Sequence, residues 1–364
     1  MNTTCLRNLR ILALVCLFAG FHTSASLFAS VRGVGFEPVT AAQQEEAQKH
    51  LDQGLRLIDE RKYEEAAKAF EQAIKLKPNI QWGHVNLSWM YLELGRYEEA
   101  ANTARRAIEL SPNTAMAYNN LGYALTQTGK YEEAIGFLKR AIELDAKTKK
   151  FYANLAFAYR SAGRYAEVLE TYKAFTEALP EEPTGHAGLA SAYAVLGQHE
   201  KALEAAKTYA RLKPDDAAAH NMLGATHANL GQFAEAASAF EKAVNLNPKD
   251  FSNLRNLGRT LAVSGQHQRA LEIFQKVEAL KPNDFETYFD LGMGYSLAKK
   301  FNESVDAYKM ALSIRRDSVP AHYGLATSYL AAGNREAALK QYEVLKELDA
   351  AAAEDLLKRI NKTQ

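Results

Sequence analysis

Two histidines, His220 and His227, are the side chains in this sequence whose spacing most invites a chemical role. Residues seven apart lie on the same side of an α-helix, two turns from each other, and a pair of imidazoles can ligate zinc. A zinc site, however, needs three or four converging ligands. The sequence offers no second cluster, and its two cysteines, Cys5 and Cys16, are far away. We therefore predict no metal site and no cofactor.

Residues that could do catalytic chemistry are present but not grouped. Serine, histidine and aspartate occur throughout, nothing in the pattern brings them together, and no glycine-rich phosphate loop follows a strand. Paired glutamates, such as Glu64 with Glu65 and Glu132 with Glu133, open amphipathic segments. Negative charge at the start of a helix interacts favourably with the helix dipole. The sequence therefore predicts no catalytic residues and no enzyme.

Aromatic and amide side chains point to binding instead. The only tryptophans, Trp82 and Trp89, are also seven residues apart, so we expect both to face the same way. Asparagines recur at a spacing of 34, as Asn86, Asn120 and Asn154. We predict that their amides form a ladder. Such a ladder beside aromatic faces suits an extended peptide or a glycan, because an amide both donates and accepts hydrogen bonds.

Arg255 and Arg259 form a second candidate binding site. They are four residues apart, so they lie on one helix face and could receive an acidic side chain or a carboxylate terminus. The alternative, which we favour, is a solvated face on which the two arginines pair with Asp250 or Asp290. Exposed ion pairs of that kind contribute little to stability.

All of these residues belong to a unit that recurs every 34 residues between positions 47 and 352. Met116 to Leu144 shows its form: two amphipathic helices separated by a turn at Gly129, where a left-handed backbone costs glycine little. Small residues recur in the first helix, at Gly54, Ser88, Gly122, Ala156, Ala190, Gly224, Gly258, Gly292 and Ala326. Proline, which cannot continue a helix, follows the second helix at Pro78, Pro112, Pro180, Pro214, Pro248 and Pro282.

This period, with small residues on facing helices, an aromatic in the second helix and a terminal proline, resembles the tetratricopeptide repeat (TPR). The resemblance covers about 306 of the 364 residues. It implies an all-α, right-handed superhelical solenoid in which each hairpin buries its apolar face against its neighbours. The nine repeats would be 47–80, 81–114, 115–148, 149–182, 183–216, 217–250, 251–284, 285–318 and 319–352, with a capping helix at 353–364.

In this family the first helix of each hairpin lines the inner curve, so the resemblance also implies a binding groove. Its candidate residues are Trp82, Asn86, Trp89, Asn119, Asn120, Tyr123, Asn154 and Phe157, with Lys150 and Arg160 also facing inward and Arg255 and Arg259 as a secondary basic patch. The alternative is that asparagine is simply common at its position and that the tryptophans pad a terminal repeat. The lysine–asparagine pair of the chaperone-binding members is absent, because the corresponding pairs are Val85 and Trp89, Asn119 and Tyr123, and Ala153 and Phe157.

Alignment of the repeats predicts two packing details. Histidines stand where Tyr118, Tyr152 and Tyr288 stand in other repeats, so we interpret them as ring-for-ring substitutions, at His84, His186, His220 and His322. Repeats four and five carry Phe175 and Tyr209 where most repeats have alanine. We therefore predict a local change of angle between these two repeats, with the loop from Pro180 to Pro183 as its hinge.

The first 40 residues differ in character from the repeats. Arg7 and Arg10 precede an apolar run at 11–21 and small residues at 23–26, a pattern typical of a secretory signal at 1–25. The run of about 11 residues is shorter than the ~20 of a membrane-spanning helix, although an uncleaved anchor is the alternative. Residues 26–40 read as a flexible leader, and Thr40 with Gln43 predicts a capping box that starts the solenoid at Ala41.

These features predict a secreted or periplasmic adaptor that binds a protein or peptide in its groove, as a scaffold for an envelope assembly. The alternative is a receptor or carrier for a small ligand or glycan at Trp82, Trp89 and Tyr123. A nucleic-acid partner is not expected, because 44 basic residues are balanced by 43 acidic ones. The partner's identity and the oligomeric state do not follow from the sequence.

Overall fold

The computed structural model describes residues 39–362. Within them the regular elements are nineteen α-helices and no strand, so the predicted all-α solenoid of nine hairpins with a capping helix is confirmed. The predicted signal segment, and the leader up to residue 38, lie outside the described residues. The hairpins are α2 (Ala41–Asp59) with α3 (Tyr63–Leu76), α4 (Gln81–Glu93) with α5 (Tyr97–Leu110), α6 (Ala115–Gln127) with α7 (Tyr131–Leu144), α8 (Lys149–Ser161) with α9 (Tyr165–Ala178), α10 (Pro183–Val195) with α11 (His199–Leu212), α12 (Ala217–Asn229) with α13 (Phe233–Leu246), α14 (Phe251–Val263) with α15 (His267–Leu280), α16 (Phe285–Leu297) with α17 (Phe301–Ile314), and α18 (Val319–Ala331) with α19 (Arg335–Leu348); α20 (Ala350–Lys362) follows.

The turn inside each hairpin needs one residue in the left-handed region. Seven of the nine turns place glycine there, with Gly129 at φ +79°. The two repeats that lack this glycine use Arg61 at φ 60° and Lys299 at φ 59°. The backbone conformation is therefore the same whether or not glycine is present, although an L side chain adopts it at some cost.

The small residue of each first helix allows its partner helix to come close. A Cβ on Gly122 would lie 2.5 Å from Leu138 Cγ, and one on Gly54 would lie 2.6 Å from Phe70 Cζ. Both contacts are far shorter than a normal van der Waals distance. The repeating glycine, alanine or serine is therefore needed for the close packing of the two helices in a hairpin.

The two ends of the described array are closed differently. At the start, Thr40 forms the predicted capping box: its Oγ1 accepts from Gln43 N at 3.2 Å, and Gln43 Oε1 accepts from Thr40 N at 2.8 Å. At the other end, α20 begins earlier than the predicted 353 and packs Leu356 and Ile360, both fully buried, against α19. Ile360 occupies the repeat position that is glycine, alanine or serine elsewhere.

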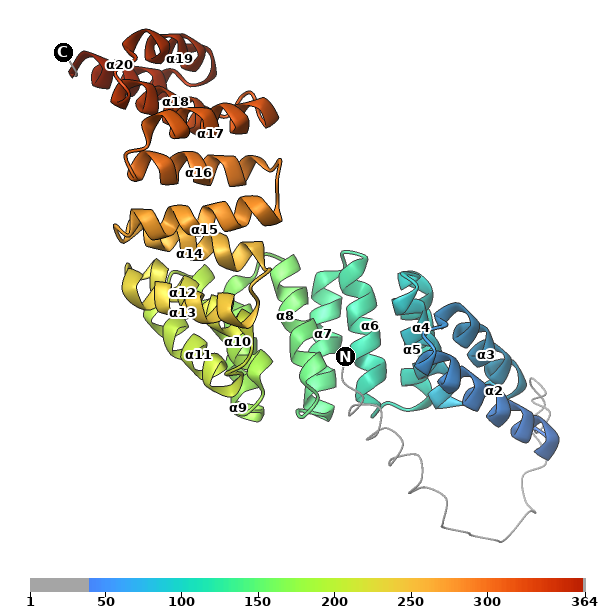
Figure 1. Cartoon of the computed structure of the whole chain (residues 1–364). Helices are drawn as coiled ribbons and strands as arrows, with labels where there is room; N and C mark the ends of the chain where they lie inside the picture. Colours follow the sequence, from blue (N-terminus) through green and yellow to red (C-terminus); the bar gives the residue numbers. More distant parts are fainter. Residues whose placement is uncertain (1–38, 363–364) are drawn as a thin grey trace.

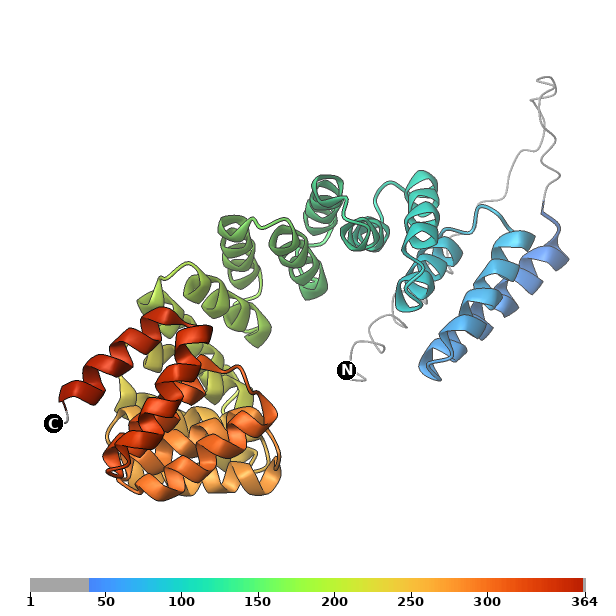
Figure 2. The same cartoon turned by 90° about the horizontal axis from the view of Figure 1, so that it is seen from above.

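The stack of hairpins changes direction along its length. In Figure 1 the helices from α2 to α8 follow one another along one line, whereas those from α14 to α20 follow a clearly different line, and Figure 2 shows the same turn from above. The turn takes in the junction of repeats four and five, for which the sequence predicts a change of angle. Within repeat four, Tyr152 of α8 stacks on Phe175 of α9, with ring centroids 4.9 Å apart.

Candidate functional site

Three aromatic side chains occupy one repeat position in three successive first helices. Trp89 comes from α4, Tyr123 from α6 and Phe157 from α8, and each is partly exposed. The ring centroids of Tyr123 and Phe157 are 6.1 Å apart, and Trp89 Nε1 donates a hydrogen bond to Glu93 Oε1 at 2.8 Å. We call these three residues, together with Trp82 at the start of α4, the aromatic surface. Trp82 is its most open member, with 51% of its surface exposed.

Two cations lie against this surface. Lys150 Nζ, at the start of α8, is 5.9 Å from the Trp89 ring, and Arg160 Cζ is 5.6 Å from the ring of Phe157. Lys150 and Trp89 belong to repeats four and two, with α6 between their helices (Figure 1). The lysine side chain therefore links two first helices that are not neighbours, through a cation–π contact.

Asn119, Asn120 and Asn154 are buried, and the predicted ladder of Asn86, Asn120 and Asn154 is wrong. Asn119 and Asn120 are 0% and 1% exposed. Asn154 Nδ2 donates to Asn119 Oδ1 at 2.7 Å, not to Asn120. Asn119 Nδ2 donates in turn to Asn120 Oδ1 at 3.4 Å. The residues that contact one another in successive first helices are thus offset by about one position from the sequence period. Asn86 takes part in none of these bonds.

This amide network, Asn154–Asn119–Asn120, continues into repeat two. Asn120 Nδ2 donates to Ser88 Oγ at 2.9 Å and to the Val85 carbonyl at 3.2 Å. The network therefore joins α8, α6 and α4 directly below the aromatic surface. Its buried polar groups are satisfied within the chain, which makes the network a support for the surface rather than a contact for a ligand. Ser88 could not be predicted as a partner from the sequence, because it occupies a position where small residues recur for helix packing.

Arg255 and Arg259 are brought together as expected, but carboxylates hold them. Arg255 Nε donates to Asp290 Oδ2 at 3.0 Å and Arg259 Nε to Asp290 Oδ1 at 2.8 Å. Both arginines also donate to Glu286 Oε2, at 2.9 and 3.2 Å. The predicted pairing with Asp290 is therefore present, whereas Asp250 instead caps α14 by accepting from Ser252 N.

The pairing of Asp290 is not on a solvated face, as the sequence had suggested, because Asp290 is 0% exposed. Burial raises the pKa of its carboxyl group, while the guanidinium groups of Arg259 and Arg255 act in the opposite direction. Asp290 occupies the repeat position of Asn120 and Asn154. This position therefore carries a buried polar contact to the preceding first helix in both halves of the array.

The histidines that replace tyrosines hold the loops between repeats. Each donates from Nε2 to a carbonyl oxygen six residues earlier at 2.8 Å, and Tyr152 makes the same contact to Ala146 at 3.2 Å. Burial lowers the pKa of His84, and the hydrogen bond to the Pro78 carbonyl oxygen acts in the opposite direction. The donor–acceptor pairs are His84 with Pro78, His186 with Pro180, His220 with Pro214, and His322 with Arg316.

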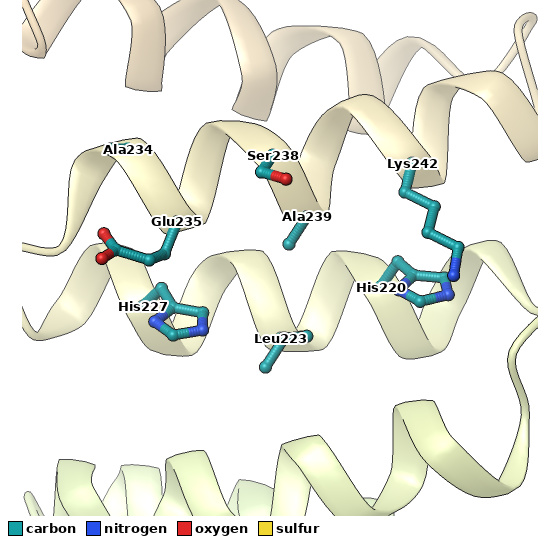
Figure 3. Close-up of a pocket in the computed structure, with 8 residues that line it drawn as sticks. All are labelled: His220, Leu223, His227, Ala234, Glu235, Ser238, Ala239 and Lys242. Carbon is teal, nitrogen blue, oxygen red and sulfur yellow. The ribbon is translucent and has the colours of Figure 1, made fainter.

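His220 and His227 face a common hollow of about 550 Å³ between them and α13 (Figure 3). His227 Nδ1 donates to Gln232 Oε1 at 2.6 Å, so each histidine already has a partner. Glu235 and Lys242 stand at opposite ends of the hollow (Figure 3). Among residues 39–362, no three histidine, cysteine, aspartate or glutamate side chains group closely enough to hold a metal ion.

A smaller hollow of about 280 Å³ lies on the first repeat, and its seven lining residues occupy the same repeat positions as those in repeat six. In the first repeat this face has no preceding repeat among the described residues to cover it. Repeat six carries a hollow at the same repeat positions in the middle of the array, where repeat five precedes it. The sequence signal is His227, at a position that is tyrosine in five other repeats: Tyr91, Tyr159, Tyr193, Tyr295 and Tyr329.

Comparison with protein families gives consistent matches. A model described as "Cilia and flagella-associated protein 70 C-terminal domain" matches residues 114–317, which is more than half of the chain. Models described as "TPR repeat" and "Tetratricopeptide repeat" match residues 90–129, 50–80 and 319–343. No curated protein matches this chain.

Several solved structures also align with this chain. A tetratricopeptide repeat protein from Parabacteroides merdae ATCC 43184 is 20% identical, with a TM-score of 0.51 over 68% of this chain and 98% of the other. The APC/C hetero-tetramer Cut9–Hcn1 is 16% identical, with a TM-score of 0.49 over 86% and 76%. YrrB, described as a TPR protein with an unusual peptide-binding site, is 21% identical, with a TM-score of 0.39 over 61% and 96%. From its repeats and from these family matches, the chain belongs to the tetratricopeptide repeat family.

Proposed function

We propose that this protein is a non-catalytic scaffold or adaptor of the cell envelope that binds a protein or peptide in the groove of its first helices. The observation that carries this proposal is the aromatic surface. Trp89, Tyr123 and Phe157 repeat at one position in three successive helices and remain partly exposed. Aromatic side chains of this kind are the usual anchors of a protein interface, because they supply large contact areas at little cost in side-chain entropy.

The rigidity beneath the aromatic surface supports the same function. The buried amide network of Asn119, Asn120 and Asn154 fixes the three helices to one another. A surface whose geometry is set before binding loses less entropy when a ligand arrives. The aromatic side chains would thus meet an extended segment in a geometry that already exists.

A small ligand or glycan is the second candidate, and the half-exposed ring of Trp82 favours it, because an open aromatic face can stack on a sugar. An extended protein segment fits better for a geometric reason. Small ligands bind in concave pockets that enclose most of their surface. The two hollows found on α2–α3 and α12–α13 include none of the aromatic surface.

The envelope location rests on the pattern of residues 1–25, which lies outside the described part of the chain. Among the helices from α2 to α20, none has the length and apolar character that crossing a bilayer requires. A test is to fractionate cells that make the protein and to sequence its mature N-terminus. Processing near Ala25 would support secretion, and an intact N-terminus in the cytosolic fraction would contradict it.

The binding function is tested by affinity capture from the cells that make the protein. Wild type is compared with Trp89→Ala and with a control, Tyr165→Ala, which removes an exposed aromatic from α9, outside the aromatic surface. We expect a stable protein partner to bind wild type and the control and to be lost from Trp89→Ala. The same partners on all three proteins would contradict the proposal. A thermal shift with sugars, without a captured protein, would favour the carrier.

A further inference from the structure

We propose that the aromatic surface selects peptide segments in which acidic residues flank an aromatic or aliphatic side chain, an inference that rests on the proposed function. Lys150 and Arg160 carry it. Each lies against a ring of the aromatic surface, and both side chains are exposed. In the part of the chain from 39 to 362, neither cation has a carboxylate within 4.0 Å.

The neighbouring cation shows that an internal pair was available to this helix. Lys149 Nζ lies 3.2 Å from Glu182 Oε2, so one lysine of the pair at the start of α8 is compensated. Lys150 is not compensated, although it occupies the second residue of a helix whose first turn holds no acidic residue. A positive charge at that place is opposed by the helix dipole. The charge of Lys150 therefore does not stabilise α8, so the stability of this helix does not explain the lysine.

The arginine pair of repeat seven differs from Lys150 and Arg160. Arg255 and Arg259 lie in the equivalent first helix, but their N–H groups are already bound by Asp290 and Glu286. An acidic ligand would have to displace these internal carboxylates there. At Lys150 and Arg160 it would meet cations whose donors are open to it. In a cation–π contact the ring covers only one side of the cation. The N–H groups on the other side remain free to bind a carboxylate.

The spacing of the two cations limits the ligand. Lys150 and Arg160 are ten residues apart on one helix, which corresponds to about 15 Å along its axis. An extended chain covers that length in about four to five residues. Acidic residues with this separation would reach both cations while the side chain between them rests on Trp89, Tyr123 or Phe157.

The test is display selection of random twelve-residue peptides on phage against the full chain. Three proteins are compared: wild type, the double variant K150Q/R160Q, and the control K130Q/K276Q. The control removes the same net charge from exposed lysines at the start of α7 and on α15. We expect wild type and the control to enrich peptides with two acidic residues around an aromatic or aliphatic one. The K150Q/R160Q variant should lose the acidic preference and keep the apolar one.

Affinity for a selected peptide is then measured from tryptophan fluorescence, because both tryptophans lie on α4 within the aromatic surface. Loss of two exposed charge contacts predicts binding about tenfold weaker for K150Q/R160Q than for wild type and the control. Enriched peptides without acidic residues, or equal affinity for all three proteins, would overturn this inference and leave the proposed function standing. No enrichment by wild type would overturn the peptide-binding function as well.

Discussion

Tyr172 of α9 fills the space that Gly188 of α10 leaves open. A Cβ on Gly188 would lie 2.0 Å from Tyr172 Cε1, and one on Gly324 would lie 2.4 Å from Tyr308 Cζ in the same arrangement four repeats later. At this repeat position other first helices carry asparagine, aspartate or methionine. A tyrosine in one repeat and a glycine sixteen residues later therefore form a matched pair across the repeat junction.

We predict that Gly188→Ala lowers the free energy of unfolding by about 1–3 kcal/mol, because the added methyl group forces the Tyr172 ring out of its place. The control is Gly136→Ala in α7, where a Cβ meets nothing within 4 Å. That change should raise stability by about 0.5–1 kcal/mol through helix propensity. Urea unfolding followed by circular dichroism checks both. Equal effects of the two substitutions would show that Tyr172 yields without cost.

Asn119→Ala should destabilise the array by about 1–3 kcal/mol, because it removes the acceptor of the buried Asn154 amide and the donor to Asn120 Oδ1. Asn86→Ala is the matched control, since that side chain is less buried and takes no part in the amide network. Its effect should stay within about 0.5 kcal/mol. The double variant N119A/N154A should lose less than the sum of its single changes, as residues in one network do. Additive losses in urea unfolding would contradict a shared network.

The raised pKa of Asp290 predicts a specific pH dependence. Between the ordinary pKa of aspartate and the raised pKa, the folded protein keeps a proton on this carboxyl group that the unfolded chain has lost. The contribution of this group to the free energy of unfolding therefore falls as the pH rises through that range. Asp290→Asn removes the titration. We therefore expect the free energy of unfolding of wild type, relative to Asp290→Asn, to decrease with rising pH in this window.

Asp306→Asn serves as the control for that measurement, because the Asp306 carboxylate is exposed and only 3.8 Å from Lys309 Nζ. Because it removes the same charge from the surface, it separates the loss of one negative charge from the loss of the buried carboxyl group. A relative stability of wild type over Asp290→Asn that rises with pH would mean that Arg255 and Arg259 outweigh the cost of burial.

His227→Tyr should stabilise the protein, because it returns to repeat six the ring that five other repeats carry at this position. The larger side chain would fill part of the hollow of about 550 Å³, and filling such a space commonly contributes about 0.5–2 kcal/mol. His227→Ala, which enlarges the hollow, should act in the opposite direction. Thermal unfolding of the three proteins gives the order. A His227→Tyr midpoint at or below that of His227→Ala would be inconsistent with an underfilled site.

The sequence predicted what depends on period and local chemistry. Gly129, Thr40 and the small residues determine where helices turn, begin and approach one another, and each acts within its own hairpin. The amide network of Asn119, Asn120 and Asn154 could not be predicted in the same way. Its partners depend on the offset between neighbouring first helices, which places Asn154 beside Asn119 rather than Asn120. The burial of Asp290 and the hollow beside His227 likewise depend on how whole repeats are placed against each other.

The hollow in repeat six also bears on how the array comes apart. In a linear stack each repeat is stabilised mainly by the two beside it, so unfolding spreads from neighbour to neighbour until it meets a weak coupling. We expect the junction beside this hollow to be such a place, because the side chain at position 227 leaves part of the space there unfilled. We expect repeats one to five and repeats six to nine to melt as two cooperative segments with a boundary at the loop between α11 and α12, each protecting its own amides from hydrogen exchange.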